Sequence, residues 1–108
     1  MKLKLLSAIF LFASAVSYSQ TPCVNGTAGG YECNGYDLMS HLPLSTFGSP
    51  GANDSWGWTD PDNGDEYVLM GLEDGTAFID ITDPVNPVYL GKLPTFTGVI
   101  VWRDIKVY

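Results

Sequence analysis

The twenty residues from Gly75 to Pro94 constrain the fold more than any other part of this chain of 108 residues. They predict two short strands joined by a turn at Asp83–Pro87. The Asp83 carboxylate can accept a hydrogen bond from the backbone two residues on, and Pro84 sets φ at the first corner of the turn. Pro87 has no N–H to donate, so it can only begin a strand or lie at a sheet edge. The segment therefore predicts an antiparallel β-hairpin.

The hydrophobic pattern beyond residue 19 predicts an all-β protein, because no stretch places apolar residues at helical spacing over ten or more positions. The run Tyr67–Met70 is apolar on both faces of its strand, which predicts a sheet covered on both sides. The predicted elements are an extended segment at Tyr36–Phe47, a loop at Gly48–Ser55, turns at Asp60–Gly64 and Asp74–Gly75, and strands at Glu66–Leu72, Thr76–Thr82, Val88–Leu93 and Val99–Tyr108.

A weak internal repeat relates Trp56 to Trp102, which lie 46 positions apart. About four predicted strands fill this interval. Propeller blades of four strands repeat at roughly 40–50 residues. The spacing predicts a β-propeller-like repeat, with about one four-stranded blade and the first strand of the next.

The first nineteen residues are predicted to be a cleaved signal peptide. Lys2 and Lys4 precede an apolar run at Leu5–Val16, and small residues follow it. Cleavage after Ser19 is expected, with Ser17 as the alternative. The run is too short to cross a bilayer as a helix. We therefore expect a secreted or cell-surface protein with no transmembrane segment in the mature chain.

The two cysteines, Cys23 and Cys33, are predicted to form a disulfide, because an exported chain enters an oxidising compartment. A disulfide would stabilise the glycine-rich loop between them by roughly 2–3 kcal/mol. A redox or metal-binding pair is the alternative. It has less support, since no third cysteine or nearby histidine accompanies them.

The charge distribution argues against nucleic acid as a partner. Nine of the twelve acidic residues lie between Asp54 and Asp83. Loss of Lys2 and Lys4 with the signal peptide leaves three basic residues against twelve acidic ones, a net charge of about −9. Such a chain would repel a polyanion or an anionic membrane. Solubility of an exported protein explains the acidity.

The turn after Trp58 offers the strongest metal-site candidate. Asp60, Asp62 and Asp65 could supply oxygen ligands to a calcium ion outside the cell, although their spacing is not that of an EF-hand. The alternative is an ordinary hairpin tip at Asn63–Gly64 with acidic residues in water, which the turn-forming composition favours. No other cofactor is expected.

Large aromatic residues provide a second candidate site, because exposed rings stack on sugar faces. The alternative, which the strand pattern favours, is that these rings belong to the core. The five rings are Trp56, Trp58, Tyr67, Tyr89 and Trp102.

Catalytic and modification motifs are weak. His41 is the only histidine, and Ser40 lies beside it, but the chain has no nucleophile-elbow motif, so no catalytic residue is predicted. Asn25 and Asn53 begin N-glycosylation acceptor patterns, which matter only in a host with that machinery.

The residues Phe78-Ile-Asp-Ile-Thr-Asp-Pro-Val-Asn-Pro-Val-Tyr-Leu-Gly91 resemble the LVIVD repeat, an extracellular repeat that is similar to propeller blades. Together with further blocks, they resemble the N-terminal part of a choice-of-anchor B family protein. The further blocks are Cys23–Gly26, Asp37–Ser45, Asn53–Asp60, Gly75–Phe78 and Trp102–Tyr108.

This resemblance implies an N-terminal fragment of a longer protein. Its expected parts are a signal peptide at 1–19, a disulfide-stapled segment at 20–54 and a truncated LVIVD-type repeat region at 55–108. The implied function is a non-enzymatic extracellular binding or adhesion module with a carbohydrate or protein ligand. The alternative is the N-terminal part of an extracellular propeller-type hydrolase whose active residues lie beyond residue 108.

Overall fold

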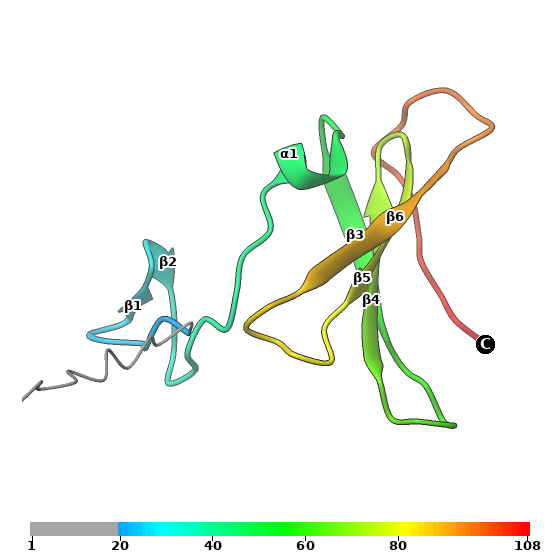
Figure 1. Cartoon of the computed structure of the whole chain (residues 1–108). Coiled ribbons are helices and arrows are strands. Elements are labelled where there is room, and N and C mark those ends of the chain that lie inside the picture. Colours follow the sequence, from blue (N-terminus) through cyan, green and yellow to red (C-terminus); the bar gives the residue numbers. More distant parts are fainter. Residues whose placement is uncertain (1–19) are drawn as a thin grey trace, which may run out of the picture.

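The structure, a computed structural model, describes residues 20–108, so the predicted signal peptide at 1–19 lies outside the described residues. Figure 1 shows a small N-terminal hairpin, a short helix and one larger sheet. The elements are β1 (Thr27–Ala28), β2 (Tyr31–Glu32), α1 (Leu44–Phe47), β3 (Ala52–Thr59), β4 (Glu66–Leu72), β5 (Gly75–Asp80) and β6 (Val88–Pro94). The all-β prediction is confirmed.

The larger sheet has four strands in the order β3-β4-β5-β6, and each strand is antiparallel to its neighbour. Every connection joins strands that are adjacent in both sequence and space. This arrangement is an up-and-down meander, the simplest order that short hairpin turns allow.

The turn between β5 and β6 forms as its sequence predicts. Asp83 Oδ1 accepts the backbone N–H of Val85 at 3.2 Å, and Asp83 Oδ2 accepts the Asn86 side-chain amide at 2.8 Å. The Asp83 carbonyl also accepts the Asn86 backbone N–H at 3.1 Å. One aspartate therefore satisfies three donors and closes the hairpin.

The turn between β4 and β5 lies one residue earlier than predicted. Its two residues are Glu73 and Asp74, and Gly75 already pairs with Leu72 inside the ladder. A Cβ at Gly75 would collide with the Leu93 carbonyl of β6. The glycine is thus required by the close approach of the neighbouring strand rather than by the turn.

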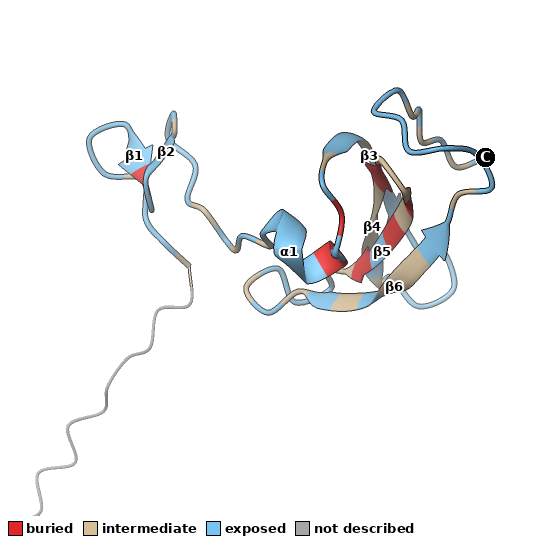
Figure 2. Ribbon diagram, turned by 90° about the horizontal axis from the view of Figure 1, so that it is seen from above, coloured by how far each residue is buried: buried red, intermediate tan, exposed pale blue. Residues whose placement is uncertain are grey.

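One face of the sheet carries the hydrophobic core and is called the covered face below. Alternation along β4 and β5 points their core side chains to the same side. The segment that ends in α1 packs over them through the buried Phe47 (Figure 2). The core residues are Phe47, Leu72, Ala77 and Ile79, with Leu42, Val68, Met70, Ile81 and Tyr89 packed around them.

The opposite face is also apolar but mostly open to solvent, and it is called the aromatic face below. Trp58 pairs with Tyr67, and Trp56 pairs with Leu69, which pairs in turn with Phe78. Residues directly opposite in a ladder share a face, so these rings lie on one side of the sheet. The aromatic face comprises Trp56, Trp58, Tyr67, Leu69, Phe78, Leu90 and Leu93. The expectation of a sheet covered on both sides is therefore wrong for residues 20–108.

Two boundary predictions before the sheet are wrong. The segment Tyr36–Phe47 is not extended to its end, because Leu44–Phe47 forms one helical turn that begins after Pro43 and stops at Gly48, with φ of 58°. The predicted loop at Gly48–Ser55 already contains the start of β3 at Ala52, where the pairing register shifts between Ala52 and Ser55. The polar residues in this irregular stretch hide the strand from a hydrophobic pattern.

The predicted strand at Val99–Tyr108 does not form, and the segment joins no ladder. Its last residues are called the tail (residues 103–108), and they lie against the aromatic face. An added Cβ on Gly71 would lie 3.2 Å from Ile105 Cγ1, and the Ile105 N–H donates to Asp54 Oδ2 at 2.8 Å. Burial alternates along the tail, with Arg103, Ile105 and Val107 half-buried. The tail thus has a strand-like pattern but no partner strand among the described residues.

Candidate functional site

Three aromatic side chains from neighbouring strands form the centre of the candidate site. The rings of Trp58 and Tyr67 lie 5.6 Å apart between centroids and are inclined by 31°. Trp56 precedes Trp58 by two positions in β3, so both project from the same face. Trp56 is 41% and Trp58 is 38% exposed. The structure therefore brings together three of the five predicted rings in a solvent-accessible position.

The other two predicted rings are elsewhere. Tyr89 lies on the covered face, where it packs edge-on against Phe47. Trp102 follows β6 in the irregular C-terminal segment and is 79% exposed. Core packing, the alternative favoured by the strand pattern, is thus correct for Tyr89 and wrong for the three tryptophans.

Sequence reasoning missed the half of this face that lies on β5 and β6. Phe78, Leu90 and Leu93 are all exposed, and together with Gly91 and Lys92 they line a shallow hollow of about 440 Å³. Leu90 reaches this side because the register shifts between Phe78 and Ile79. The alternation in β5 could have located Phe78. The bulge that turns Leu90 outward has no clear signal in the sequence.

Carboxylates surround the end of the aromatic face at Tyr67. Partial burial, followed by the negative charges of Asp65, Asp80 and Asp60, raises the pKa of the Tyr67 hydroxyl above its ordinary value. Asp80 pairs with Tyr67 across the ladder and so lies on the same face. The aromatic rings therefore adjoin an acidic end of the sheet.

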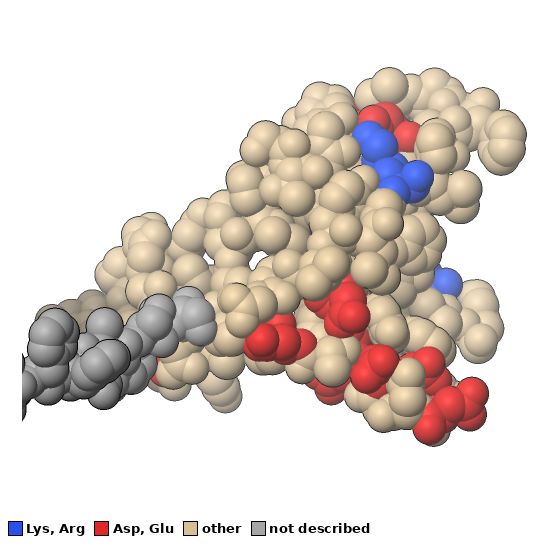
Figure 3. All heavy atoms as spheres, viewed as in Figure 1, with Lys and Arg blue, Asp and Glu red and all other residues tan. Residues whose placement is uncertain are grey.

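Acidic side chains gather over the β3–β4 and β5–β6 turns, at the lower end of the view in Figure 3, whereas the basic side chains lie mainly toward the opposite end, where acidic side chains lie beside them. The ion pairs of residues 20–108 join Lys92 to Asp74 at 2.6 Å and Lys106 to Asp104 at 3.4 Å. Neither ion pair involves the β3–β4 or β5–β6 turn. Within residues 20–108, therefore, the carboxylates of these two turns form no ion pair with a basic side chain.

The predicted calcium ligands occupy a closed turn. The Asp60 N–H donates to the Asp65 carbonyl at 2.8 Å, and Asp60 Oδ1 accepts the Asp62 N–H at 2.9 Å. Asp65 Oδ2 accepts the Asn63 amide at 2.9 Å. Across residues 20–108, no three acidic, histidine or cysteine side chains are grouped as metal ligands. The carboxylates of Asp60 and Asp65 support the turn itself, and calcium binding stays a prediction.

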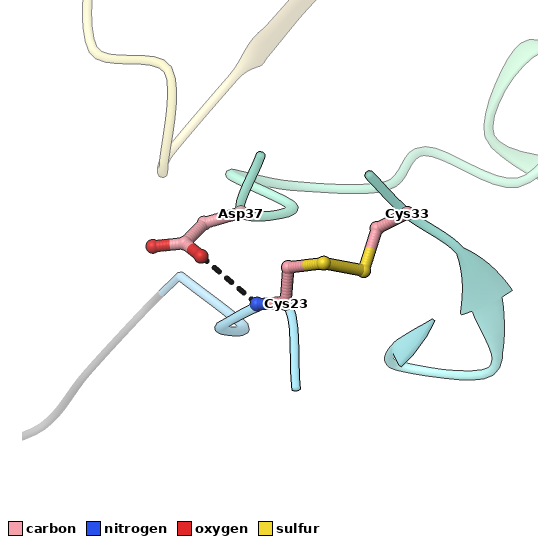
Figure 4. Close-up of a disulfide and its surroundings, with 3 residues drawn as sticks. All are labelled: Cys23, Cys33 and Asp37. Atoms are coloured by element: carbon pink, nitrogen blue, oxygen red, sulfur yellow. Dashed lines mark hydrogen bonds between the residues drawn. A yellow bond between two sulfur atoms is a disulfide. The ribbon is translucent and has the colours of Figure 1, made fainter. Parts of the chain in front are cut away.

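The disulfide between Cys23 and Cys33 is confirmed, and it holds the N-terminal segment together (Figure 4). The two Cα atoms lie 5.9 Å apart. Beside the disulfide, the Asp37 carboxylate accepts the backbone N–H of Cys23 at 2.9 Å. Thr21 and Leu38 exchange two backbone hydrogen bonds of 2.8 and 2.9 Å, which close the segment into a loop.

His41 and the glycosylation motifs have structural contacts. His41 Nε2 lies 3.2 Å from the Tyr31 hydroxyl, so it links the N-terminal hairpin to the segment before α1. Asn25 is exposed and has a positive φ of 51°. The Asn53 amide donates to the Arg103 carbonyl at 3.2 Å and so joins β3 to the tail.

Residues 20–108 contain no helix with the length and hydrophobicity that crossing a bilayer requires. The described fold defines an all-β protein with a disulfide-closed N-terminal segment and one four-stranded antiparallel sheet. Comparison with protein-family models, curated proteins and solved structures finds no match to the chain.

Proposed function

We propose that this chain is an exported binding or adhesion module of the propeller-like repeat type, and that it acts by burying the aromatic face against another protein surface. The single observation that carries the proposal is the exposure of Trp56, Trp58 and Phe78 on one side of a four-stranded meander. Large contiguous apolar patches are uncommon on soluble proteins and mark sites of interaction.

The sheet has the form expected of a propeller blade. A blade is a four-stranded antiparallel meander whose two faces are covered by neighbouring sheets. Here the strand order is β3-β4-β5-β6, and apolar side chains project from both faces. The resemblance of Phe78–Gly91 to the LVIVD repeat supports the same interpretation, and the family resemblance supports a location outside the cell.

A binding role also fits the chemistry of the aromatic face. Tryptophan and tyrosine supply much of the binding energy at protein interfaces, because their rings bury a large area with few rotatable bonds. Trp58 and Tyr67 already contact each other, so little ordering is needed on binding. Carboxylates adjoin this face at the end near Tyr67.

Retention on intact cells of the producing organism tests the proposal. The purified chain, secreted with its own leader, is compared with the double variant Trp56→Ala, Trp58→Ala and with the control Phe96→Ala. Phe96 is fully exposed in the segment after β6 and does not belong to the aromatic face. We expect the control to be retained like the unchanged chain and the double variant to lose at least about tenfold in affinity.

Circular dichroism of all three proteins shows that the variants are folded. Equal retention of the double variant would contradict a binding role for the aromatic face. Protease treatment of the cells identifies the partner class, since a protein partner would be destroyed and a polysaccharide would not. Retention that survives the protease would assign the face to carbohydrate instead.

A further inference from the structure

We propose that Asn34, together with Gly35, is a site of spontaneous deamidation, at which the asparagine side-chain amide becomes a carboxylate without an enzyme. The inference goes beyond the proposed function and does not depend on it. Asn-Gly pairs occur three times in the chain, at 25–26, 34–35 and 63–64. All three pairs are exposed, so their composition and solvent access do not distinguish them. The hydrogen bonds around each pair do.

The reaction is an attack of a backbone nitrogen on the side chain that precedes it. The Gly35 nitrogen forms a bond to Asn34 Cγ, the Cγ–Nδ2 bond breaks, and the amide group takes up the proton of the Gly35 N–H and leaves as ammonia. The product is a five-membered succinimide ring. Water then opens the ring at one of its two carbonyl carbons. Opening at Cγ gives aspartate, and opening at the main-chain carbonyl carbon gives isoaspartate, whose main chain is longer by one methylene.

Ring closure requires the asparagine side chain and the following peptide to turn toward each other. Glycine favours this step, because it has no Cβ beside the attacking nitrogen and adopts a wide range of φ. A hydrogen bond that holds either reacting group must open first, and this local opening lowers the rate. The pair with the fewest such bonds should therefore react first.

At the 63–64 pair, both reacting groups are held. Asn63 Oδ1 accepts the Asp65 N–H at 2.9 Å, and Asn63 Nδ2 donates to Asp65 Oδ2 at 2.9 Å. The Gly64 N–H, which would supply the attacking nitrogen, donates to the Asp60 carbonyl at 2.8 Å. Three hydrogen bonds thus protect Asn63.

At the 25–26 pair, the backbone of a tight turn is held. Asn25 has φ of 51° and Gly26 has φ of 79°, as the two central residues of a type I′ hairpin turn require. Val24 and Thr27 exchange backbone hydrogen bonds of 3.0 and 3.1 Å across this turn. Rotating the peptide between Asn25 and Gly26 would disturb both bonds, so this pair is protected as well.

At the 34–35 pair, neither reacting group is held. Within residues 20–108, the Asn34 side chain and the Gly35 N–H take part in no hydrogen bond. A Cβ added to Gly35 would meet nothing within 4 Å, so the peptide has room to rotate. Asn34 is therefore the asparagine that the fold leaves free to react.

The contacts on either side of this pair allow the product to stay folded. Cys33 is bonded to Cys23, and Leu38 exchanges two backbone hydrogen bonds with Thr21. The extra methylene of isoaspartate would lengthen only the short connection between these two anchored positions. The converted chain carries one more negative charge, and because the reaction is irreversible, the converted fraction increases with the age of the chain.

Incubation of the folded chain at neutral pH tests the inference. Samples are digested with pepsin in acid, where deamidation is slow, and the three asparagine peptides are followed by mass spectrometry. We expect Asn34 to convert at least about tenfold faster than Asn25 or Asn63, because two or three hydrogen bonds must open at those positions. Equal rates, or a faster reaction at Asn25 or Asn63, would overturn the inference. Fragmentation by electron transfer should detect isoaspartate at position 34, and conversion to aspartate alone would exclude the succinimide route.

The reduced and alkylated chain in urea shows whether the fold sets this order. Without the native hydrogen bonds, the three pairs should convert at similar rates. The same tenfold preference for Asn34 in urea would assign it to the neighbouring residues in the sequence and overturn the structural argument. Circular dichroism of the converted folded chain should match that of the fresh chain, and loss of its β signal would contradict the predicted tolerance.

A pair of variants tests the protective hydrogen bonds directly. Asp65→Ala removes the carboxylate that accepts the Asn63 amide, and we expect deamidation at Asn63 to become at least about fivefold faster. Asp62→Ala is the matched control, because the Asp62 side chain takes no part in the hydrogen bonds of Asn63 or Gly64. It should leave the rate at Asn63 unchanged. Equal rates at Asn63 in the two variants would show that these hydrogen bonds do not select the reactive asparagine.

Discussion

Phe47 packs edge-on against Tyr89, with ring centroids 5.4 Å apart and ring planes at 76°. The contact joins the last residue of α1 to β6, across 42 positions of sequence. Edge-to-face packing is a favoured geometry for two aromatic rings. Through this contact, the segment that ends in α1 packs over the covered face of the sheet.

Removing this ring should destabilise the sheet. We expect Phe47→Ala to lower the free energy of unfolding by about 3 kcal/mol, because a buried aromatic side chain is replaced by a cavity. Phe96→Ala, at a fully exposed ring, should leave it unchanged. Urea unfolding followed by circular dichroism measures both, and equal midpoints for the two variants would show that Phe47 is not part of the core.

A second prediction concerns the close approach of β5 and β6. Gly75→Ala places a Cβ against the Leu93 carbonyl, and we expect a loss of about 1–3 kcal/mol in the free energy of unfolding. Gly57→Ala is the matched control, because nothing lies within 4 Å of its added Cβ. Its effect should stay within about 0.5 kcal/mol. A Gly75→Ala variant as stable as the control would contradict the strand spacing.

Reduction of the Cys23–Cys33 disulfide should loosen the N-terminal segment only. We expect a gain of about 30-fold or more in hydrogen exchange at the Cys33 N–H, which donates to the Gly26 carbonyl at 2.9 Å. Exchange in β4 and β5 should not change, because no disulfide constrains the sheet. The Cys23→Ser, Cys33→Ser variant, which should not respond to reductant, is the control. Loss of protection in β4 on reduction would show that the two parts unfold together.

The pH dependence should reveal the Asp74–Lys92 contact. The hydrogen bond from Lys92 holds the pKa of Asp74 below its ordinary value of 3.8. A lowered pKa in the folded state means that the stabilisation is fully present above pH 3.8 and is lost as the pH falls through the lower folded value. Asp74→Asn should therefore be less stable than the unchanged chain at pH 7, and the difference should vanish in strong acid.

Urea midpoints between neutral pH and strong acid measure this difference. Asp62→Asn is the control, because the Asp62 carboxylate makes no ion pair within residues 20–108. The difference in urea midpoint between Asp62→Asn and the unchanged chain should therefore be the same at neutral pH and in strong acid. A constant offset for Asp74→Asn as well would show that the ion pair does not contribute to stability.

Local chemistry was the predictable part of this fold. The turn at Asp83 depends on one carboxylate and one proline a few residues apart, so the sequence contains all the groups that form it. The strand Glu66–Leu72 was predicted with its observed bounds, since its apolar run is uninterrupted. The start of β3 was missed because its residues are polar and its pairing register is irregular. The turn of α1 was missed because it follows a proline and ends in Phe47, which packs in the core.

The candidate site was only partly predictable for a related reason. Trp56, Trp58 and Tyr67 could be selected as large rings, but their exposure depends on which face α1 covers. A hydrophobic pattern that is apolar on both faces does not distinguish the covered face from the open one. Tyr89 and Trp58 look alike in the sequence, and the fold places them on opposite sides of the sheet.

The sequence alone determined the β class, the disulfide and the turn at Asp83, because each depends on neighbouring residues or on a pair close in the chain. Only the tertiary structure decided that Phe47 covers one face, that the tail lies against the other without pairing, and that Trp58 is left in solvent. These outcomes depend on contacts between residues tens of positions apart, and packing energy rather than local conformational preference selects among them.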